Sequence, residues 1–450
     1  MLTKTVYRST PIPTDKMPSG IFHLVANEGA ERFSFYGMRA ILVIFMTELL
    51  LSQDGVLDVM TEAEARAHFH LFTSAVYFFP FLGALLADGW LGKYHTIIPL
   101  SLVYCAGHFA LAVDQTRMGL LIGLTLIAIG SGGIKPCVSA VLGDQFGVRN
   151  RHLLSKAFSW FYFSINFGAF FSTLLTPWLL KHYGPDIAFG VPGLLMLFAT
   201  LVFWLGRYKY VHIRPDPRQF LAELKSAAAW HAILKLSGIF LFVAFFWSLY
   251  DQTSSAWVLQ AKHMDRNWLG INWLPSQVQA VNPVLIMIFI PVFTYGIYPA
   301  IDRVFPLTPL RKISIGFFVT MLAFLISASI EQQIEAGLRP NIVWQLLAYV
   351  VITGAEVMVS ITCLEFSYTQ APLKLKSVIM SLFLLSVSLG NAFTSFVNYL
   401  IQNPDGTTWL NGASYYYFFA GIMLVVSIVF IFVAKGYREK TYFHGEASHG

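Results

Sequence analysis

The sequence predicts an all-α protein that crosses a membrane many times. Of its 450 residues, 56% are hydrophobic and only 12% are charged, whereas soluble domains carry about 25% charged residues. The mean hydropathy is +0.61. Apolar segments of the roughly 20 residues that a spanning helix needs recur along the whole chain. A polytopic membrane protein follows from these observations.

Twelve segments are predicted to be transmembrane helices. They cover residues 20–51, 66–88, 94–115, 117–146, 155–182, 188–208, 229–262, 276–300, 310–333, 341–370, 373–402 and 411–436. An even number of spans places both termini on the same side. A cleavable signal peptide is not expected, because the start of the chain is polar and the first apolar segment is too long for one.

Lysine and arginine are distributed unevenly between the predicted loops. The side that carries the termini holds 20 of them, and the opposite side holds 6. The positive-inside rule therefore predicts cytoplasmic N- and C-termini in a plasma or inner cell membrane. The net charge of +6 is explained in the same way, because the excess of basic residues lies in the loops on one side of the membrane. No nucleic-acid partner is therefore expected.

A polar connection divides the chain into two halves of six helices each. The predicted parts are an N-terminal segment 1–19, a bundle 20–207, a linker 208–228, a second bundle 229–436 and a tail 437–450. The halves resemble each other weakly, since Pro80 near the end of helix 2 has a counterpart in Pro291 of helix 8. Two parallel six-helix repeats joined by a central linker predict the major facilitator fold.

The connection between helices 2 and 3 supports this fold. Its spacing from Gly83 through Asp88 to Gly92 and Lys93 resembles the short acidic and basic loop of that superfamily. Asp88 and Lys93 are therefore expected to form a charge clasp between helices at the cytoplasmic rim, with a structural role in gating.

Helix 1 carries a polar stripe. Glu28, Glu31, Arg32, Tyr36 and Arg39 share one helix face, because positions three and four apart lie side by side. Ionisable groups in a membrane helix cost several kcal/mol unless they are paired or face water. The stripe therefore predicts a functional polar site, the alternative being a static intrahelical salt bridge.

Two further ionisable groups lie within predicted spans. Lys135, next to Pro136 in helix 4, needs a counter-ion, and the simplest partner is Glu28 or Glu31 of helix 1; a purely structural lysine is the alternative. His70 of helix 2 titrates near physiological pH when unperturbed. Its neighbourhood leaves two interpretations open, a proton site or a histidine at the membrane rim.

The remaining polar residues suit a ligand that carries both charges. They are Tyr162 and Asn166 in helix 5, Trp247 and Asp251 in helix 7, Asn282 in helix 8, and Glu356 and Glu365 in helix 10. Carboxylates would bind an ammonium, cations a carboxylate, and amides peptide groups. Motifs for phosphate binding or a zinc protease are missing, and the three cysteines lack metal-ligand spacing. The run from Gly130 to Gly133 only weakly resembles a nucleophile motif, because Ser131 has no obvious base. No enzyme activity, cofactor or metal is expected.

Four motifs in the right order resemble the proton-dependent oligopeptide transporters. They are Glu28-x-x-Glu31-Arg32-Phe33, Gly133 to Ala140 with Gly143-Asp144-Gln145-Phe146, Phe161-Tyr162 to Asn166-x-Gly168, and Glu356 with Leu364 to Pro372. The resemblance covers nearly the whole chain from Asn27, and the helix 10 motif is close to that of the animal peptide transporters.

The resemblance implies a role for each matching residue. Glu28, Glu31, Arg32 and Lys135 would couple proton movement to peptide binding, with His70 as a further proton site. Arg32 and Lys135 would hold the peptide carboxylate, and Glu356 the ammonium. Tyr36, Tyr77, Tyr162, Asn166, Trp247 and Asn282 would line the cavity, and Arg39, Asp88, Lys93, Asp251 and Glu365 would serve gating or structure.

The sequence departs from the family pattern at a few positions. Phe35 and Phe383 stand where a tyrosine and a tryptophan are common, Ala355 replaces a glycine, and Phe167 is bulky. These changes bear on side-chain preference and leave the charged residues intact.

The predicted function is import of di- and tripeptides with protons, by alternating access, in a monomer within the lipid bilayer. One alternative keeps the fold and the proton coupling and changes the cargo to nitrate or another anionic metabolite. A second alternative is a sensor or a membrane enzyme that transports nothing.

Overall fold

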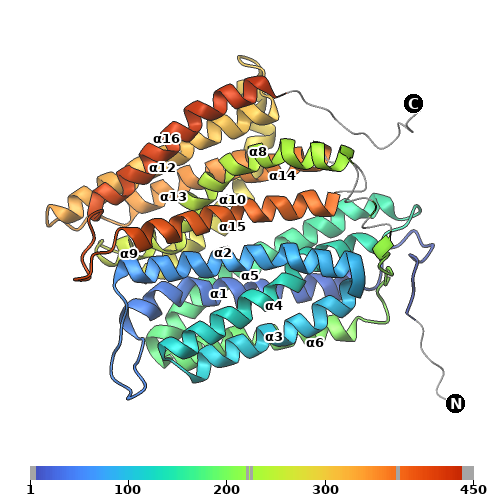
Figure 1. The fold of residues 1–450 in the computed structure, drawn as a ribbon, viewed down its shortest axis with the longest axis horizontal. Coiled ribbons are helices and arrows are strands. Elements are labelled where there is room, and N and C mark those ends of the chain that lie inside the picture. Colours follow the sequence, from blue (N-terminus) through green and yellow to red (C-terminus); the bar gives the residue numbers. More distant parts are fainter. Residues whose placement is uncertain (1–6, 219–221, 223–226, 371–375, 438–450) are drawn as a thin grey trace. The chain divides into compact units, whose positions relative to one another are not determined.

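The computed structural model describes residues 7–218, 222, 227–370 and 376–437, and it is almost entirely helical (Figure 1). The chain divides into two compact units. Unit 1 comprises Met1–Val59 and Ala75–Ala222, and unit 2 comprises Met60–Ser74 and Glu223–Gly450. The second helix of the chain therefore begins in unit 2 and ends in unit 1.

Unit 1 is built from six long helices. They are α1 (Ile21–Glu48), α2 (Glu62–Leu86, from Ala75 on) with the π-helical turn η1 (Ala87–Leu91), α3 (Lys93–Val113), α4 (Arg117–Asp144), the short turn η2 (Arg151–Leu153) with α5 (Leu154–Tyr183), and α6 (Pro185–Leu205). Helix α1 packs against α5 and α6, and α3 packs against α4 and α6.

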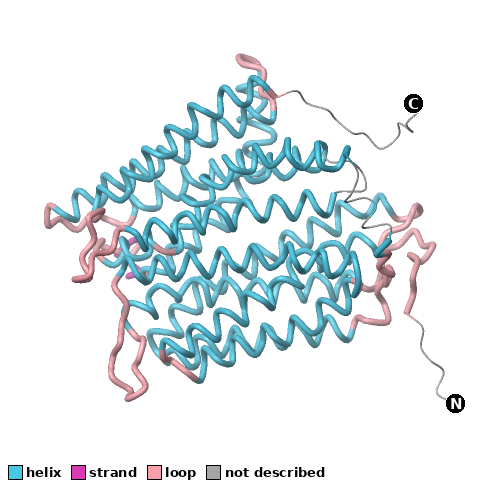
Figure 2. Tube along the Cα trace, in the orientation of Figure 1, coloured by secondary structure: helices cyan, strands magenta, loops and turns pink. Residues whose placement is uncertain are grey.

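Unit 2 contains more interruptions within its helices. Its elements are α8 (Ala227–Tyr250), η3 (Asp251–Ser254), α9 (Ala256–Lys262), β1 (Asn267–Trp268), β2 (Ile271–Asn272), η4 (Pro275–Ala280), α10 (Val281–Val292), η5 (Phe293–Ile297), α11 (Tyr298–Asp302), α12 (Pro309–Glu335), α13 (Val343–Glu356), η6 (Val357–Ile361), α14 (Thr362–Gln370), α15 (Lys376–Leu400) and α16 (Gly412–Gly436). The two strands form one antiparallel hairpin, drawn in magenta in Figure 2.

The helices match the predicted spans in number and order. In the described part of the chain, eleven helical stretches are long and apolar enough to cross a membrane. Helix α1, with 28 residues, is the twelfth long helix, and its charged stripe makes it less apolar than the others. Helix α2 begins at Glu62, four residues before the predicted segment. Thr61 caps it by accepting a hydrogen bond from the Glu64 N–H at 3.2 Å, and acidic side chains in a first turn are favourable.

Two interruptions in unit 2 lie at residues that the sequence assigned to the site. A 3₁₀ turn begins at Asp251, where the sequence predicted one continuous helix. A π-helical turn follows Glu356 directly and divides the predicted tenth helix into α13 and α14. Irregular turns within helices are frequent at functional sites.

Close helix contacts position the polar residues of unit 1. A Cβ atom on Gly83 of α2 would lie 1.9 Å from the carbonyl oxygen of Gly132 in α4, so only glycine fits there. Gly168 of α5 approaches Gly29 of α1 in the same way, with a Cβ-to-oxygen distance of 2.5 Å. These contacts bring α2 against α4 and α5 against α1, next to Lys135 and Arg32.

Candidate functional site

The stripe on α1 forms a compact ionic cluster. Arg32 Nε lies 2.7 Å from Glu28 Oε1 and 3.2 Å from Glu31 Oε2. Both glutamates are fully buried, and the Arg32 side chain is 12% exposed. One guanidinium therefore contacts two carboxylates that are shielded from solvent.

Lys135 of α4 lies between two aromatic rings. Its Nζ is 4.0 Å from the ring centroid of Phe35 and 4.0 Å from that of Tyr77. An ammonium over an aromatic face is attracted by the negative face of the ring. Its positive charge also acts on the Glu28 carboxylate. The predicted ion pair between Lys135 and Glu28 or Glu31 stays a prediction.

The charges of this cluster can balance. Two carboxylates, Glu28 and Glu31, face two cations, Arg32 and Lys135, so the fully ionised cluster sums to zero. An additional carboxylate would leave one negative charge in excess, and protonation of one glutamate would remove it. The cluster can therefore take up a carboxylate and a proton together and remain neutral.

In unit 2, Glu356 is held by an amide. Asn282 Nδ2 donates to Glu356 Oε2 at 2.9 Å and to Thr353 Oγ1 at 3.0 Å. Tyr250 also forms a hydrogen bond with this carboxylate. Glu356 ends α13 at the π-helical turn, and Asn282 lies in the first turn of α10, so both stand where regular helix begins or ends.

Trp247 of α8 offers a hydrogen-bond donor. Its Nε1 is buried and has no hydrogen-bond partner among the described residues. Its ring meets that of Phe383 edge to face, with centroids 6.2 Å apart. An oxygen atom of a bound ligand could accept this hydrogen bond.

His70 is fully buried in unit 2. Its Nδ1 lies 2.7 Å from Asn391 Oδ1, and its Nε2 lies 2.8 Å from Ser255 Oγ. Asn391 Nδ2 donates onward to Asp251 Oδ2 at 2.6 Å. Because an amide oxygen only accepts, Nδ1 carries a proton and donates, and a hydroxyl can pair with Nε2 in either protonation state.

Other predicted residues lie on α5 and α1. Asn166 donates from Nδ2 to the carbonyl oxygen of Tyr162 at 3.0 Å, within its own helix, and the Tyr162 side chain is exposed. Tyr36 meets Phe35 edge to face at 5.4 Å. Arg39 is buried on α1.

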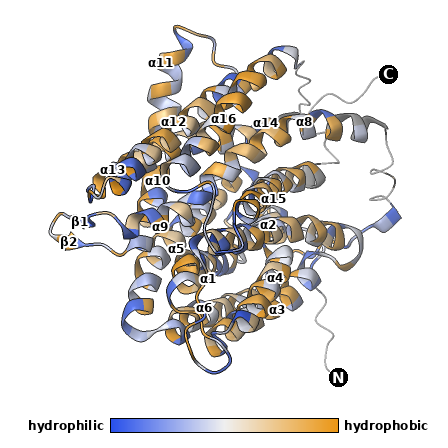
Figure 3. Cartoon of the chain, turned by 60° about the vertical axis from the view of Figure 1, so that its left-hand side comes forward, coloured by the Kyte–Doolittle hydropathy of each residue, from blue (hydrophilic) through white to orange (hydrophobic). Residues whose placement is uncertain are grey.

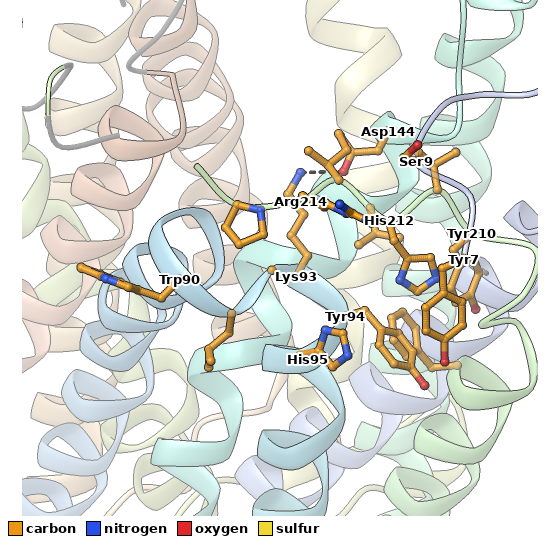
Figure 4. Close-up of a pocket in the computed structure, with 17 residues that line it drawn as sticks. Tyr7, Ser9, Trp90, Lys93, Tyr94, His95, Asp144, Tyr210, His212 and Arg214 are labelled. Carbon is orange, nitrogen blue, oxygen red and sulfur yellow. Dashed lines mark hydrogen bonds and ion pairs between the residues drawn. The ribbon is translucent and has the colours of Figure 1, made fainter. Parts of the chain in front are cut away.

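The basic residue of the predicted clasp pairs with an acid that the sequence analysis did not choose. Lys93 Nζ lies 2.6 Å from Asp144 Oδ2 and joins α3 to α4 (Figure 4). Asp88 takes no part in this ion pair. The pair borders a cavity of about 570 Å³ at the ends of α3, α4 and α6, which none of the predicted peptide-binding residues line. Glu365 is exposed on α14 and forms no ion pair with the described residues.

Replacement of Asp144 by asparagine is expected to destabilise unit 1. Lys93 and Asp144 are only 20% and 17% exposed, so breaking the pair leaves a poorly hydrated cation and should cost about 1–3 kcal/mol. Thermal unfolding in detergent measures this. Asp15→Asn is the matched control, because its pair with Arg149 is 65% and 59% exposed and should contribute little. Equal losses in both variants would contradict the clasp.

Sequence reasoning missed the partners of the predicted residues. Asp144 ends an apolar helix, and Asn391 lies in the middle of one. A polar residue within a predicted span indicates a polar contact with another helix, and this signal could have identified Asp144 and Asn391. Ser255 carries no such signal, since isolated serines are common in spans. Among the described residues, no group of three or more histidine, cysteine or acidic side chains could hold a metal ion.

Comparisons with known proteins agree with one family. A profile described as POT family matches residues 94–237 and 218–416. "Peptide transporter family 1" of Drosophila melanogaster is 38% identical over 372 residues, which is 72% of this chain and 49% of that protein. "Solute carrier family 15 member 2" of Homo sapiens is 36% identical over 386 residues, 72% of this chain and 51% of that protein. The chain thus spans about half the length of these two relatives.

Solved structures match over nearly the whole chain. An auto-inhibited POT family peptide transporter has a TM-score of 0.86 at 35% identity, with 95% of this chain and 99% of that chain covered. The POT family transporter PepTSo has a TM-score of 0.84 at 36% identity, with 93% and 98% covered. The predicted all-α membrane fold of the major facilitator type is confirmed.

Proposed function

This chain belongs to the POT family, and from that premise we propose that it imports di- and tripeptides together with protons by alternating access. Relatives that are named as peptide transporters support this cargo. The chain is a multi-pass membrane protein. We further propose that both termini are cytoplasmic and that the protein works as a monomer.

The charge balance of the α1 cluster carries the proposal. Glu28 and Glu31 together offset Arg32, which they contact at 2.7 and 3.2 Å, and Lys135 nearby. A peptide carboxylate that binds to Arg32 and Lys135 adds a negative charge in a buried site. A proton taken up by one glutamate cancels that charge and releases a cation for the peptide. Peptide binding and protonation would therefore favour each other.

The other end of the peptide would bind in unit 2. Glu356, oriented by Asn282 at 2.9 Å, offers its carboxylate to the ammonium group. The buried Nε1 of Trp247 offers a donor for a backbone carbonyl. A substrate that carries both a carboxylate and an ammonium, as a short peptide does, can bind to both groups.

His70 is proposed as a second proton site. In the neutral ring, Nε2 accepts from Ser255; after protonation, Nε2–H donates to the same oxygen at 2.8 Å. Asn391 also donates to the buried Asp251 carboxylate at 2.6 Å, so the ring belongs to a connected polar network. The site can therefore hold either protonation state without losing a hydrogen bond at His70.

Replacement of Ser255 by alanine is expected to shift proton-driven uptake to lower pH. Both forms of the ring would lose a hydrogen bond, but the charged form loses more, because a bond to a charged group contributes about 1.5–3 kcal/mol and a neutral one about 0.5–1.5 kcal/mol. The difference corresponds to about one pH unit. The pH dependence of dipeptide uptake measures this. Ser74→Ala is the control, since Ser74 bonds Ser388 at 3.1 Å instead. An unchanged pH profile would exclude His70 as a coupling site.

The experiment that tests the proposal is uptake of a labelled dipeptide into proteoliposomes with an imposed inward proton gradient. Wild type should accumulate the dipeptide against its gradient, and Glu31→Gln should lose this accumulation. Unlabelled dipeptide should compete and nitrate should not. Competition by nitrate without any dipeptide uptake would favour the alternative cargo, an anion carried on the same fold.

A further inference from the structure

The hairpin of unit 2 is an unusual surface feature. Strands β1 and β2 pair Asn267 with Asn272 and Trp268 with Ile271, and Leu269 and Gly270 form the turn with φ angles of 55° and 76°. Two positive φ angles define a type I′ turn, where Asn-Gly is preferred. Leu269 is the one described residue other than glycine with positive φ.

The tip of this hairpin is apolar and exposed. Leu269 is 77% exposed, Ile271 52% and Trp268 38%. A Cβ atom built on Gly270 would meet nothing within 4 Å, so the space beside the turn is empty. Asparagine at position 269 would remove both the backbone strain and the exposed apolar surface. A leucine there is favourable if the tip has an apolar environment outside the chain.

The base of the hairpin is held rigidly. Arg266 donates to the carbonyl oxygens of Ala261 and Lys262, at the end of α9, at 3.1 and 3.2 Å. Asn341, before α13, donates to Asp265 Oδ2 and to the Asn267 carbonyl oxygen, both at 3.1 Å. The tip is therefore fixed relative to α9 and α13 and does not belong to a loose loop.

The surface next to the hairpin is apolar and exposed. Helix α13 begins at Val343 as a membrane-spanning stretch, two residues after Asn341. Val343 and Trp344 are exposed, and tryptophan is enriched where a span meets the membrane interface. Figure 3 shows the hairpin beside the start of α13, so its apolar tip adjoins this exposed apolar surface.

We propose that the tip Trp268-Leu269-Gly270-Ile271 inserts into the bilayer interface and anchors unit 2 at the end where α9 and α13 meet. Trp268 and Ile271 form a cross-strand pair that flanks the inserted Leu269. Asn267 and Asn272 at the base, both exposed, remain at the headgroup level. The ligand of this surface is the phospholipid itself.

A nitroxide label at Leu269→Cys tests the proposal in a background without Cys105, Cys137 and Cys363. The full chain is reconstituted into phosphatidylcholine–phosphatidylglycerol vesicles at a low protein-to-lipid ratio, where copies rarely meet. The label should be accessible to oxygen and protected from a nickel chelate, with an oxygen-to-nickel ratio several-fold above that of a label at Asp405→Cys in the exposed α15–α16 loop. Equal ratios at the two sites would overturn the proposal.

A second measurement separates insertion from local structure. A label at Trp268→Cys is measured in two backgrounds, one with Leu269 intact and one with Leu269→Asn. Asparagine suits the positive φ, so the thermal stability should not fall, while the oxygen-to-nickel ratio at position 268 should drop several-fold as the tip leaves the lipid. An unchanged ratio with unchanged stability would mean that the tip does not depend on lipid contact.

Discussion

Replacement of Lys135 by alanine is expected to abolish proton-driven accumulation of peptide. The ammonium would be the second cation of the α1 cluster, and without it Glu28, Glu31 and Arg32 retain an excess negative charge even before a peptide carboxylate enters. Loss of one partner of a buried charge pair costs about 2–5 kcal/mol, or a roughly 30- to 5,000-fold weaker apparent affinity. Accumulation and gradient-free exchange of a labelled dipeptide in proteoliposomes measure coupling and binding separately.

The matched control is Lys181→Ala, which removes an exposed lysine from the last turn of α5. It should leave uptake near the wild-type rate, so a loss confined to Lys135→Ala cannot be ascribed to net charge. Phe35→Leu is informative in addition, because it removes one of the two rings 4.0 Å from the ammonium and keeps the charge. Wild-type accumulation in Lys135→Ala would exclude the cluster from coupling.

The local part of the site could be predicted from the sequence. Glu28 and Arg32 are four residues apart on one helix, and α-helical geometry alone brings them together; the structure has them at 2.7 Å. The number and order of the spans follow from hydropathy in the same way, because each span must satisfy its own backbone hydrogen bonds in lipid.

Contacts between helices could not be predicted in this way. His70 bonds Ser255 and Asn391, which are 185 and 321 residues away. Lys93 pairs with Asp144 across 51 residues, although Asp88 is closer in sequence. Which groups meet depends on helix rotation and on close contacts such as that of Gly83 with Gly132. A single sequence gives the polar face of a helix and does not give the helix that it faces.

Phe35, which replaces a tyrosine common in the family, shows the same limit of prediction from a single sequence. The sequence indicates a missing hydroxyl relative to related transporters and nothing about the consequence. In the structure, the ring is fully buried and its face lies against the Lys135 ammonium. A residue that looks like a lost polar contact is thus an electrostatic partner, because an aromatic face attracts a cation without a hydroxyl.

Replacement of Glu356 by glutamine is expected to remove selectivity for a free peptide N-terminus. Glutamine has the same shape and its amide oxygen can still accept from Asn282, but it carries no charge for the ammonium. A hydrogen bond to a charged group contributes about 1.5–3 kcal/mol, so the apparent affinity for a free dipeptide should fall roughly 10- to 150-fold. Affinity for the N-acetylated dipeptide, weak in the wild type, should hardly change.

The decisive quantity is the ratio of the two affinities in each variant, because a general loss of fold lowers both. Glu331→Gln is the matched control: this carboxylate also accepts an amide hydrogen bond, from Gln260 Nε2 at 2.7 Å, but lies outside the proposed peptide site. It should keep the wild-type ratio. If Glu356→Gln kept it as well, the ammonium would have to bind elsewhere, and unit 2 would contribute no charge to recognition of the substrate. A ratio that collapses in Glu356→Gln alone would instead assign the ammonium end of the peptide to unit 2.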